Sequence, residues 1–322
     1  MISFQSDLKR IEQALHENAF TQEPINLYQP IQYILTLGGK HIRPLFALTC
    51  YELYSNDYQK IINPALAVEF FHNFTLMHDD IMDKASIRRG KPTVHTQWNL
   101  NTALLSGDAL MIVAYQYFEG LEADLFAKIV PQFSKMALQV CEGQQLDIDF
   151  ETSENVTIDQ YLEMITLKTA VLIAFASKMG ALIGGASDKN ANNLYEFAKN
   201  LGIAFQIQDD YLDVYGNTEK VGKKHAGDIY ENKKTILYLK ALEKASPEQK
   251  NILQHWYSTT EENLEKVQAV TQIFNDLDIP SETKKIIEKY HQISLNHLEK
   301  VETSQSKEKL FKIAKYLIQR EL

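Results

Sequence analysis

Two clusters of aspartates share one spacing, and carboxylates at that spacing can bind metal ions. The clusters are Asp79, Asp80 and Asp83 in the segment DDIMD, and Asp209, Asp210 and Asp213 in the segment DDYLD. Residues four apart share a face of a helix, and the neighbour of the first lies close to that face. Each cluster therefore gathers negative charge at one place, and cations among the carboxylates would relieve their repulsion.

Magnesium fits such a pair of clusters. It takes one or two protein carboxylates, keeps several waters and completes its shell with phosphate oxygens of a substrate. Two facing clusters would clamp one diphosphate through bridging metal ions. A single DDxxD is often only a solvated helix end, but here both copies follow strongly apolar segments, where three aspartates are costly without a function. The spacing of EF-hand calcium loops is absent from the sequence.

Cationic segments lie around the aspartates. They are GGKHIRP from Gly38, RRGKP from Arg88, KT at Lys168, GKK from Gly222 and NKKT from Asn232. The formal net charge of −9 argues against nucleic-acid binding, so these local groups must supply the field for a phosphate. One phosphate site would be bridged by metal ions. A second, without metal, would be made by Lys40, Arg43 and Arg89, beside glycines that let backbone N–H groups approach an anion.

Helical periodicity runs through the elements that must position these groups. Apolar residues recur at three- and four-residue spacing, as in Leu8, Ile11 and Leu15, and only 8 prolines and 13 glycines punctuate the 322 residues. Segments of about 65–83, 102–118, 133–150, 160–185 and 190–215 are apolar around most of their surface, which predicts central positions in one helical bundle. No βαβ rhythm is present, so we expect an all-α fold.

The same pattern predicts a single domain over residues 1–322, with its helices around a central apolar cavity. The core that carries the motifs would span about 38–235. The stretch of about 240–322 is more polar and more broken, and we expect it to pack outside that core.

Cysteine usage and hydropathy favour a cytoplasmic protein. Cys50 and Cys141 have no CxxC partner, which predicts neither a disulfide framework nor a thiolate zinc site. Charged residues interrupt the N-terminal segment, so it does not read as a signal peptide. The most apolar stretch, 170–186, is shorter than a bilayer span and contains Lys178, so we expect a buried helix and no transmembrane segment.

These motifs together resemble those of trans-isoprenyl diphosphate synthases of the polyprenyl synthetase family. GGKHIRP resembles the isopentenyl diphosphate site, DDIMD the first aspartate-rich motif and RRGKP the basic segment after it. The match continues in the family's order with GQQLD from Gly143, KT at Lys168, FQIQDDYLD from Phe205, GKKHAGD from Gly222 and NKKT from Asn232. The resemblance implies an isoprenoid synthase-type fold, a homodimer, and a short-chain prenyltransferase that condenses isopentenyl diphosphate with dimethylallyl, geranyl or farnesyl diphosphate.

The resemblance also implies a role for individual residues. Both aspartate clusters and Asp147 would lie in the region of the magnesium ions, three in number, that bridge the allylic diphosphate; the first cluster and Asp209 would bind magnesium directly. The allylic diphosphate would be held by Arg88, Lys168, Lys223 and Lys233, and isopentenyl diphosphate by Lys40, Arg43, His72 and Arg89. Thr169 and Gln206 would lie beside the developing allylic cation and, with Lys168, form the catalytic set. Lys224 and His225 depart from the family's pattern.

Product length is expected to depend on the helical turn before Asp79. A growing apolar tail would run down the bundle interior, with Phe74 and Thr75 as its floor and Phe70 and Phe71 as bulk a turn lower. In the family, one aromatic five positions before the motif and a small residue four before it resemble synthases that stop at geranylgeranyl diphosphate. Farnesyl diphosphate is the close rival, and ordinary core packing of Phe74 is the alternative interpretation.

Two other kinds of protein remain as alternatives. A class I terpene cyclase shares the helical fold and one aspartate cluster, but it should lack the second DDxxD and the GGKHIRP segment. A non-catalytic synthase subunit usually loses aspartates from one cluster. Both clusters and GGKHIRP are complete in this sequence, which favours the prenyltransferase.

Overall fold

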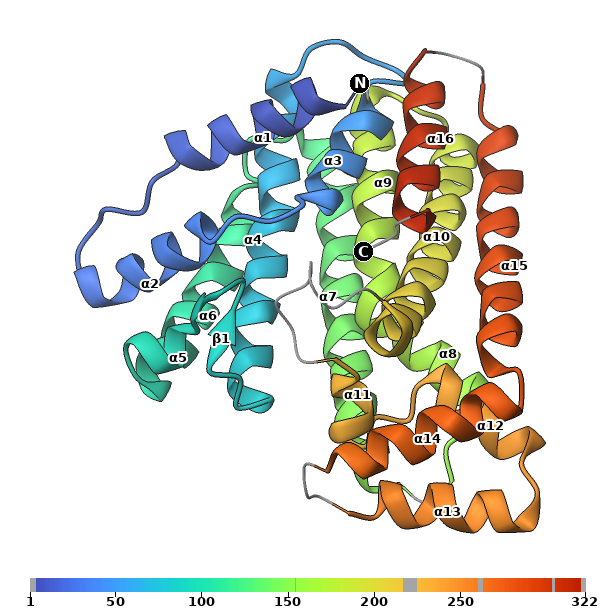
Figure 1. The fold of residues 1–322 in the computed structure, drawn as a ribbon. Coiled ribbons are helices and arrows are strands. Elements are labelled where there is room, and N and C mark those ends of the chain that lie inside the picture. Colours follow the sequence, from blue (N-terminus) through green and yellow to red (C-terminus); the bar gives the residue numbers. More distant parts are fainter. Residues whose placement is uncertain (1–3, 154, 217–224, 260–262, 303–304, 320–322) are drawn as a thin grey trace. The chain divides into compact units, whose positions relative to one another are not determined.

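Helices make up most of the chain in the computed structural model, which describes residues 4–153, 155–216, 225–259, 263–302 and 305–319 (Figure 1). The first ten are α1 (Gln5–Glu17), α2 (Ile25–Thr36), α3 (Ile42–Tyr51), α4 (Gln59–Met82), α5 (Val94–Gln97), α6 (Leu100–Gln116), α7 (Ala123–Thr152), α8 (Ile158–Ile165), α9 (Val171–Gly184) and α10 (Asp188–Tyr215). They are followed by α11 (Gly227–Tyr230), α12 (Ile236–Lys244), α13 (Pro247–Tyr257), α14 (Leu264–Asp276), α15 (Ile279–Glu299) and α16 (Gln305–Ile318).

Two short features interrupt the α-helices. A π-helix, η1 (Thr166–Ala170), joins α8 to α9. Strands β1 (Ile87–Arg88) and β2 (Lys91–Pro92) form an antiparallel hairpin in which Ile87 is opposite Pro92. The predicted all-α class is confirmed. The predicted segments of about 65–83, 102–118, 133–150 and 190–215 each lie on one helix, although the helix of the third begins at residue 123. The segment of about 160–185 covers three elements, α8, η1 and α9.

The chain divides into two compact units. The first comprises Met1–Ser134, Phe175–Tyr195 and Val301–Lys312, and the second comprises Lys135–Ala174, Glu196–Lys300 and Ile313–Leu322. The first aspartate cluster therefore belongs to the first unit and the second cluster to the second. The single-domain organisation over 1–322 stays a prediction.

The first unit is built on α4, which packs against α3 and α6. Helix α4 is long and apolar on most sides, and Phe70 and Phe71 on it are fully buried. Gly107 on α6 permits the close approach, because a Cβ there would lie 2.3 Å from Nε2 of His78. The end of α4, where the first aspartates lie, is thus fixed against α6.

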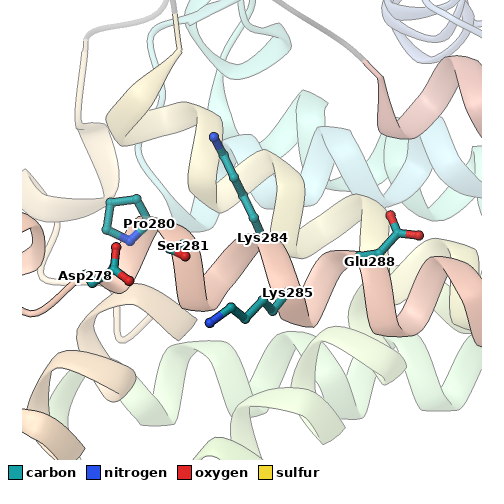
Figure 2. A pocket seen from close by; sticks show the side chains of 6 residues that line it. All are labelled: Asp278, Pro280, Ser281, Lys284, Lys285 and Glu288. Carbon is teal, nitrogen blue, oxygen red and sulfur yellow. The ribbon is translucent and has the colours of Figure 1, made fainter.

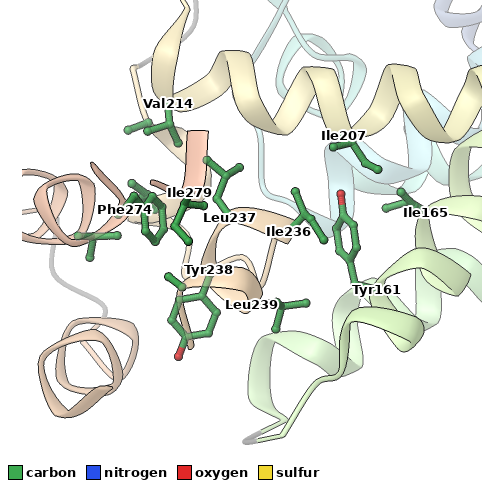
Figure 3. Packing of buried hydrophobic residues seen from close by; sticks show 14 of the residues in the cluster. Tyr161, Ile165, Ile207, Val214, Ile236, Leu237, Tyr238, Leu239, Phe274 and Ile279 are labelled. Atoms are coloured by element: carbon green, nitrogen blue, oxygen red, sulfur yellow. The ribbon is translucent and has the colours of Figure 1, made fainter. Parts of the chain in front are cut away.

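The second unit is held together by one apolar cluster, part of which Figure 3 shows. Helices α8, α10 and α12 contribute residues such as Ile165, Ile207 and Leu237. Helices α14 and α15 contribute Phe274 and Ile279. The expectation that the stretch after about 240 packs outside the core is therefore wrong for these two helices. Their polar residues cover one face while the apolar face is buried, which is the normal pattern of an amphipathic helix.

One helical stretch, Ile158–Gly184, is long and apolar enough to cross a membrane by length and composition alone. The expectation that the apolar stretch 170–186 is too short to span a membrane is therefore wrong. Helix α8 and the π-helix η1 precede α9 without a break and lengthen the apolar helical stretch. However, 78% of its most apolar 18-residue window is buried inside the protein. Burial of this kind marks a core helix, so the stretch is weak evidence for a membrane span.

Candidate active site

The first aspartate cluster lies at the C-terminal end of α4. Asp80 is buried, whereas Asp83 caps the helix and is exposed. The β1–β2 hairpin brings Arg88 back to α4, where its Nε lies 2.9 Å from both carboxylate oxygens of Asp80 and its Nη2 lies 2.7 Å from Oδ1. Asp80 is thus neutralised by a neighbour, and Asp83 is the accessible member of the cluster.

The GGKHIRP loop is folded around Arg89. Gly38 has a φ of 79°, a left-handed conformation that glycine adopts without strain. Its carbonyl oxygen accepts a hydrogen bond from Nη1 of Arg89, and a Cβ on Gly39 would lie 3.1 Å from Nη2 of the same guanidinium. His41 precedes α3 and its Nδ1 lies 2.9 Å from Oε1 of Glu69 on α4. The structure therefore brings together the predicted loop and Arg89.

Arg43 and His72 form the inner part of the same site. Nη1 of Arg43 donates to Nε2 of His72 over 2.9 Å. Burial and the nearby charges of Arg43 and Arg89 hold the pKa of His72 well below 6.5, so its ring is neutral and can accept this bond. Burial also lowers the pKa of Arg43 to about 10, which leaves it cationic at neutral pH. Nε of Arg43 is buried and has no hydrogen-bond partner within the described part of the chain.

The second aspartate cluster lies near the end of α10 and its members differ in environment. Asp209 is exposed, and Asp210 is 6% exposed. Oδ2 of Asp210 accepts from the hydroxyl of Tyr161 over 2.5 Å, and its Oδ1 accepts from Nε2 of Gln206 over 2.9 Å. Burial raises the pKa of Asp210 to about 7, although both hydrogen bonds favour its charged form.

Asp213 completes this cluster by contact with α11. Its Oδ2 accepts a hydrogen bond from the backbone N–H of Asp228 over 3.0 Å. Burial is the main cause that raises the pKa of Asp228 well above its ordinary value, and the charges of Asp210 and Asp213 raise it further. The sequence contained Asp228 within GKKHAGD, but nothing in its spacing singled it out.

Lys168 and Thr169 lie on the π-helix η1. Nζ of Lys168 lies 2.6 Å from Oδ2 of Asp147, and Oγ1 of Thr169 donates to Oε1 of Gln206 over 3.0 Å. Gly143 on α7 makes room for this bulge, since a Cβ there would lie 2.2 Å from the backbone N of Lys168. Single π-turns of this kind are frequent at functional sites. The structure brings all three predicted catalytic residues, Lys168, Thr169 and Gln206, into one place.

The remaining predicted diphosphate ligands are Lys40, Lys223 and Lys233. Lys233 comes after α11, where its backbone N–H donates to the carbonyl of Asp228 over 2.9 Å and its Nζ lies 3.2 Å from Oε2 of Glu231. Lys223 and the rest of GKK lie outside the described residues. Lys40 lies in the GGKHIRP loop and is exposed.

The carboxylates are suited to magnesium without forming a complete cage. No three His, Cys, Asp or Glu side chains within the described ranges lie close enough to hold a metal ion by themselves. Asp80 and Asp210 are occupied by Arg88 and by Tyr161 with Gln206. The other members of the two clusters also supply hard carboxylate oxygens, few in each unit, which suits an ion that keeps its waters and shares a substrate's phosphates.

Phe74 and Thr75 lie one turn before the first cluster, as the helical spacing requires. Phe74 is 8% exposed, and its ring centroid lies 5.5 Å from that of Phe71, which in turn packs edge-on against Phe133 at 5.3 Å. The hydroxyl of Thr75 is bonded to the carbonyl of His72 over 2.8 Å. Aromatic rings thus close the space below the cluster, although Phe70 takes no part and instead contacts Phe20 and Tyr117.

A separate pocket of about 530 Å³ lies along α15 (Figure 2). Its lining includes Ser281, Lys284, Lys285 and Glu288, and none of the predicted site residues. Nζ of Lys284 lies 5.2 Å from the ring centroid of Tyr211 on α10. This open surface pocket is distinct from the two groups of motif residues.

Comparisons with known proteins identify the class. The model of the polyprenyl synthetase family matches residues 24–274. The geranylgeranyl diphosphate synthase of Methanosarcina mazei is 36% identical over 313 residues, which is 97% of this chain and 95% of that protein. A crystal structure of a geranylgeranyl pyrophosphate synthase has a TM-score of 0.95 and 42% identity, with both chains covered completely.

A third relative was solved with ligands. The geranylgeranyl pyrophosphate synthase of Corynebacterium glutamicum, complexed with isoprenyl diphosphate and magnesium, has a TM-score of 0.86 and 27% identity over 97% of each chain. The fold is therefore that of the all-α prenyl synthases. The chain belongs to the polyprenyl synthetase family, and the predicted enzyme class, a prenyltransferase, is confirmed by its relatives.

Proposed function

We propose that this enzyme condenses isopentenyl diphosphate with dimethylallyl, geranyl and farnesyl diphosphates, releases diphosphate, and makes geranylgeranyl diphosphate as its main product. The observation that carries the proposal is a second cluster of basic residues within the first unit. Arg43 at the start of α3 donates to His72 of α4, and Arg89 in the β1–β2 hairpin donates to the carbonyl oxygen of Gly38 in the GGKHIRP loop. A cyclase, which takes a single diphosphate, has no use for a second anion site. Two relatives that match over the full length, at 36% and 42% identity, are geranylgeranyl diphosphate synthases.

Magnesium is the expected metal, with three ions around the allylic diphosphate. Asp79, Asp83 and Asp209 would hold it directly, and when bound it supplies Lewis-acid neutralisation of the leaving group. The Corynebacterium glutamicum relative, solved with magnesium and isoprenyl diphosphate, supports this assignment. Asp80 and Asp210 contribute through the neighbours to which they are bonded.

The cationic side chains hold the two substrates at different places. Arg88, Lys168 and Lys233 bind the allylic diphosphate, with Lys223 as a further predicted ligand. Asp147 orients Lys168 through its bond of 2.6 Å. Lys40, Arg43, His72 and Arg89 bind isopentenyl diphosphate, and the buried Nε–H of Arg43 supplies a donor that no residue described in the structure accepts from.

Positive charge develops on the allylic carbon as its bond to diphosphate breaks. The oxygens of Thr169 and Gln206 stabilise this charge from fixed positions, which costs no reorganisation during the reaction. Bond formation to the isopentenyl double bond follows, and the departing diphosphate accepts the final proton. Phe74 and Phe71 then limit the length of the tail.

A homodimer in the cytoplasm completes the proposal. Helix α6 exposes Leu104, Leu105 and Ile112, and the side chain of Leu105 is 61% exposed. Large apolar side chains spaced along one exposed helix face are typical of a surface that another subunit covers. A second copy packed along α6 would bury this face.

A product assay tests the function. Purified protein with magnesium and radiolabelled isopentenyl diphosphate is given each allylic diphosphate in turn, and chain lengths are resolved after dephosphorylation. We expect a twenty-carbon alcohol as the main product. A fifteen-carbon product would retain the reaction and contradict the assignment of Phe74 as the floor. No elongation with any primer, despite magnesium-dependent binding of diphosphate, would favour a cyclase or a non-catalytic subunit.

A further inference from the structure

We propose that Tyr161 is a positioning residue for the prenyl transfer. Acting through Asp210, it fixes the side-chain amide of Gln206 so that the carbonyl oxygen, and not the NH₂ group, faces Thr169 and the reacting carbon. The inference rests on the proposed function, in which Thr169 and Gln206 lie beside the allylic cation. Tyr161 lies outside the sequence motifs named above, and we infer its role from three consecutive hydrogen bonds.

The three bonds lie within the second unit and link α8, η1 and α10. The hydroxyl of Tyr161 donates to Oδ2 of Asp210 over 2.5 Å. Oδ1 of Asp210 accepts from Nε2 of Gln206 over 2.9 Å. Oε1 of Gln206 accepts from the hydroxyl of Thr169 over 3.0 Å. The relay therefore runs from a core tyrosine to a residue of the predicted catalytic set.

The chemistry of these groups specifies the orientation of the amide. Oδ1 of Asp210 accepts from Nε2 of Gln206, so the NH₂ end of the amide lies toward Asp210. The carbonyl end must then face Thr169, and one lone pair of Oε1 remains beside the bond to the hydroxyl. A carbonyl oxygen stabilises a nearby cation, whereas an NH₂ group would place the positive end of its dipole there.

Tyr161 is held rigidly enough to set this geometry. Its side chain is 1% exposed and belongs to the apolar cluster of the second unit. Figure 3 shows the ring rising from α8 among Ile165, Ile207 and Ile236, with its hydroxyl directed toward the helix that carries Ile207. Packing leaves the ring little freedom, so the hydroxyl fixes one oxygen of Asp210 and leaves the other for Gln206.

Burial separates the part played by Asp210 from that of Asp209. Asp209 is exposed at the end of α10, whereas Asp210 is buried and uses both oxygens within the relay. The two adjacent aspartates of the second cluster thus have different roles. Asp209 is available to a metal ion, and Asp210 holds the catalytic amide.

Tyr161→Phe tests the relay, because it removes only the hydroxyl and keeps the packed ring. In single-turnover assays at saturating substrate we expect the rate constant to fall about tenfold, with the KM values of both diphosphates changed less than about twofold. Tyr51→Phe is the matched control. Tyr51 is fully buried, and its hydroxyl is bonded to Ser55 and to the carbonyl of Asp57, outside the relay. We expect this control to lower the melting temperature and leave the rate unchanged.

A second comparison shows whether Tyr161 acts through Gln206. On a Gln206→Ala background the orientation of the amide no longer matters, so adding Tyr161→Phe should change the rate by less than about twofold. An equal loss on both backgrounds would overturn the proposal, as would a normal rate in the single Tyr161→Phe variant. Melting curves followed by circular dichroism give the melting temperature of each variant, and all assays are run below it.

A measurement without catalysis separates failure of the relay from failure of the proposed function. In protein labelled with ¹⁵N at glutamine side chains, the amide signal of Gln206, assigned by its loss in Gln206→Ala, should shift in Tyr161→Phe and stay in place in Tyr51→Phe. An unchanged Gln206 signal in Tyr161→Phe would contradict the relay even in an enzyme that elongates. A shifted signal in a protein that fails to elongate would contradict the function and retain the relay.

Discussion

Arg88 binds Asp80 through two of its guanidinium nitrogens, with Nε 2.9 Å from each carboxylate oxygen and Nη2 2.7 Å from Oδ1. Asp80 is 2% exposed, so Arg88 replaces the contacts that water would otherwise make with the carboxylate. We expect Arg88→Ala to lower the free energy of unfolding by about 2–3 kcal/mol, because a buried carboxylate loses its counter-charge. Chemical denaturation at pH 7 measures the loss, and prenyl transfer should fall as well.

Adding Asp80→Asn to Arg88→Ala separates stability from activity. The double variant no longer buries an unpaired charge, so it should regain much of the lost stability while remaining inactive. If the double variant is as unstable as Arg88→Ala, the ion pair is not what stabilises the end of α4. Recovery of activity would mean that neither residue takes part in binding the diphosphate.

Asp79→Ala and Asp209→Ala should each reduce kcat by orders of magnitude and leave the fold intact. Asp209 is exposed and Asp79 is only partly buried, so removing either carboxylate disturbs the core little. The reaction loses a metal ligand, and with it part of the stabilisation of the leaving group. Steady-state kinetics and melting curves test this. Asp276→Ala, also an exposed helical aspartate, is the control, and near-normal turnover in Asp79→Ala or Asp209→Ala would refute the metal clamp.

The sequence predicted the members of each site better than their pairing. GGKHIRP and RRGKP carry charge and flexibility that local patterns reveal, and the structure brings Arg89 next to Gly38 and Gly39. That Arg89 bonds to the carbonyl of Gly38 depends on the tertiary fold. Likewise, Asp80 and Asp210 look identical to their neighbours in sequence, and only burial distinguishes them.

Other features could not be read from local patterns. The π-helix at Lys168 is in close contact with Gly143, and this contact exists only when α7 packs on η1. Tyr161 looks like an ordinary core residue of an amphipathic helix, because its partner Asp210 comes from α10. Phe274 and Ile279 were assigned outside the core, because the mean polarity of α14 and α15 conceals their apolar faces.

Phe74→Ala should lengthen the product by at least one five-carbon unit. The ring of Phe74 lies between the first cluster and Phe71, so its removal lets the tail advance to the next aromatic. We expect a stability loss of about 3 kcal/mol from the cavity. Phe70→Ala is the control, since Phe70 is fully buried on the same helix but contacts Phe20 and Tyr117 instead. Equal product lengths in all three proteins would show that Phe74 is only core packing.

Gly143→Ala should distort the π-helix that carries Lys168. The new Cβ would lie 2.2 Å from the backbone N of Lys168 and 2.7 Å from the carbonyl carbon of Leu167, and backbone atoms cannot move aside cheaply. We expect a stability loss of about 1–3 kcal/mol and a fall in kcat of about tenfold. Gly120→Ala, where a Cβ meets no heavy atom within 4 Å, is the control. Kinetics of Gly143→Ala indistinguishable from this control would contradict the tight approach of α7.

The stability of the protein should fall below about pH 6.5 because of His72. Burial and the charges of Arg43 and Arg89 hold its pKa in the folded state below the value of 6.5 expected in the unfolded chain. Unfolding therefore takes up a proton in the window between these two pKa values, so this contribution is complete above pH 6.5 and is lost as the pH falls toward the folded pKa.

His72→Gln removes this titration and keeps an oxygen that can accept from Arg43. The difference in free energy of unfolding between the natural protein and His72→Gln should shrink with falling pH, by at most about 1.4 kcal/mol per pH unit. Denaturation curves from pH 7.5 to pH 5 measure it. If the free energies of unfolding of the two proteins change in parallel with pH, His72 has the same pKa in the folded and unfolded states. His72 would then not be held neutral as the acceptor that orients Arg43 toward isopentenyl diphosphate.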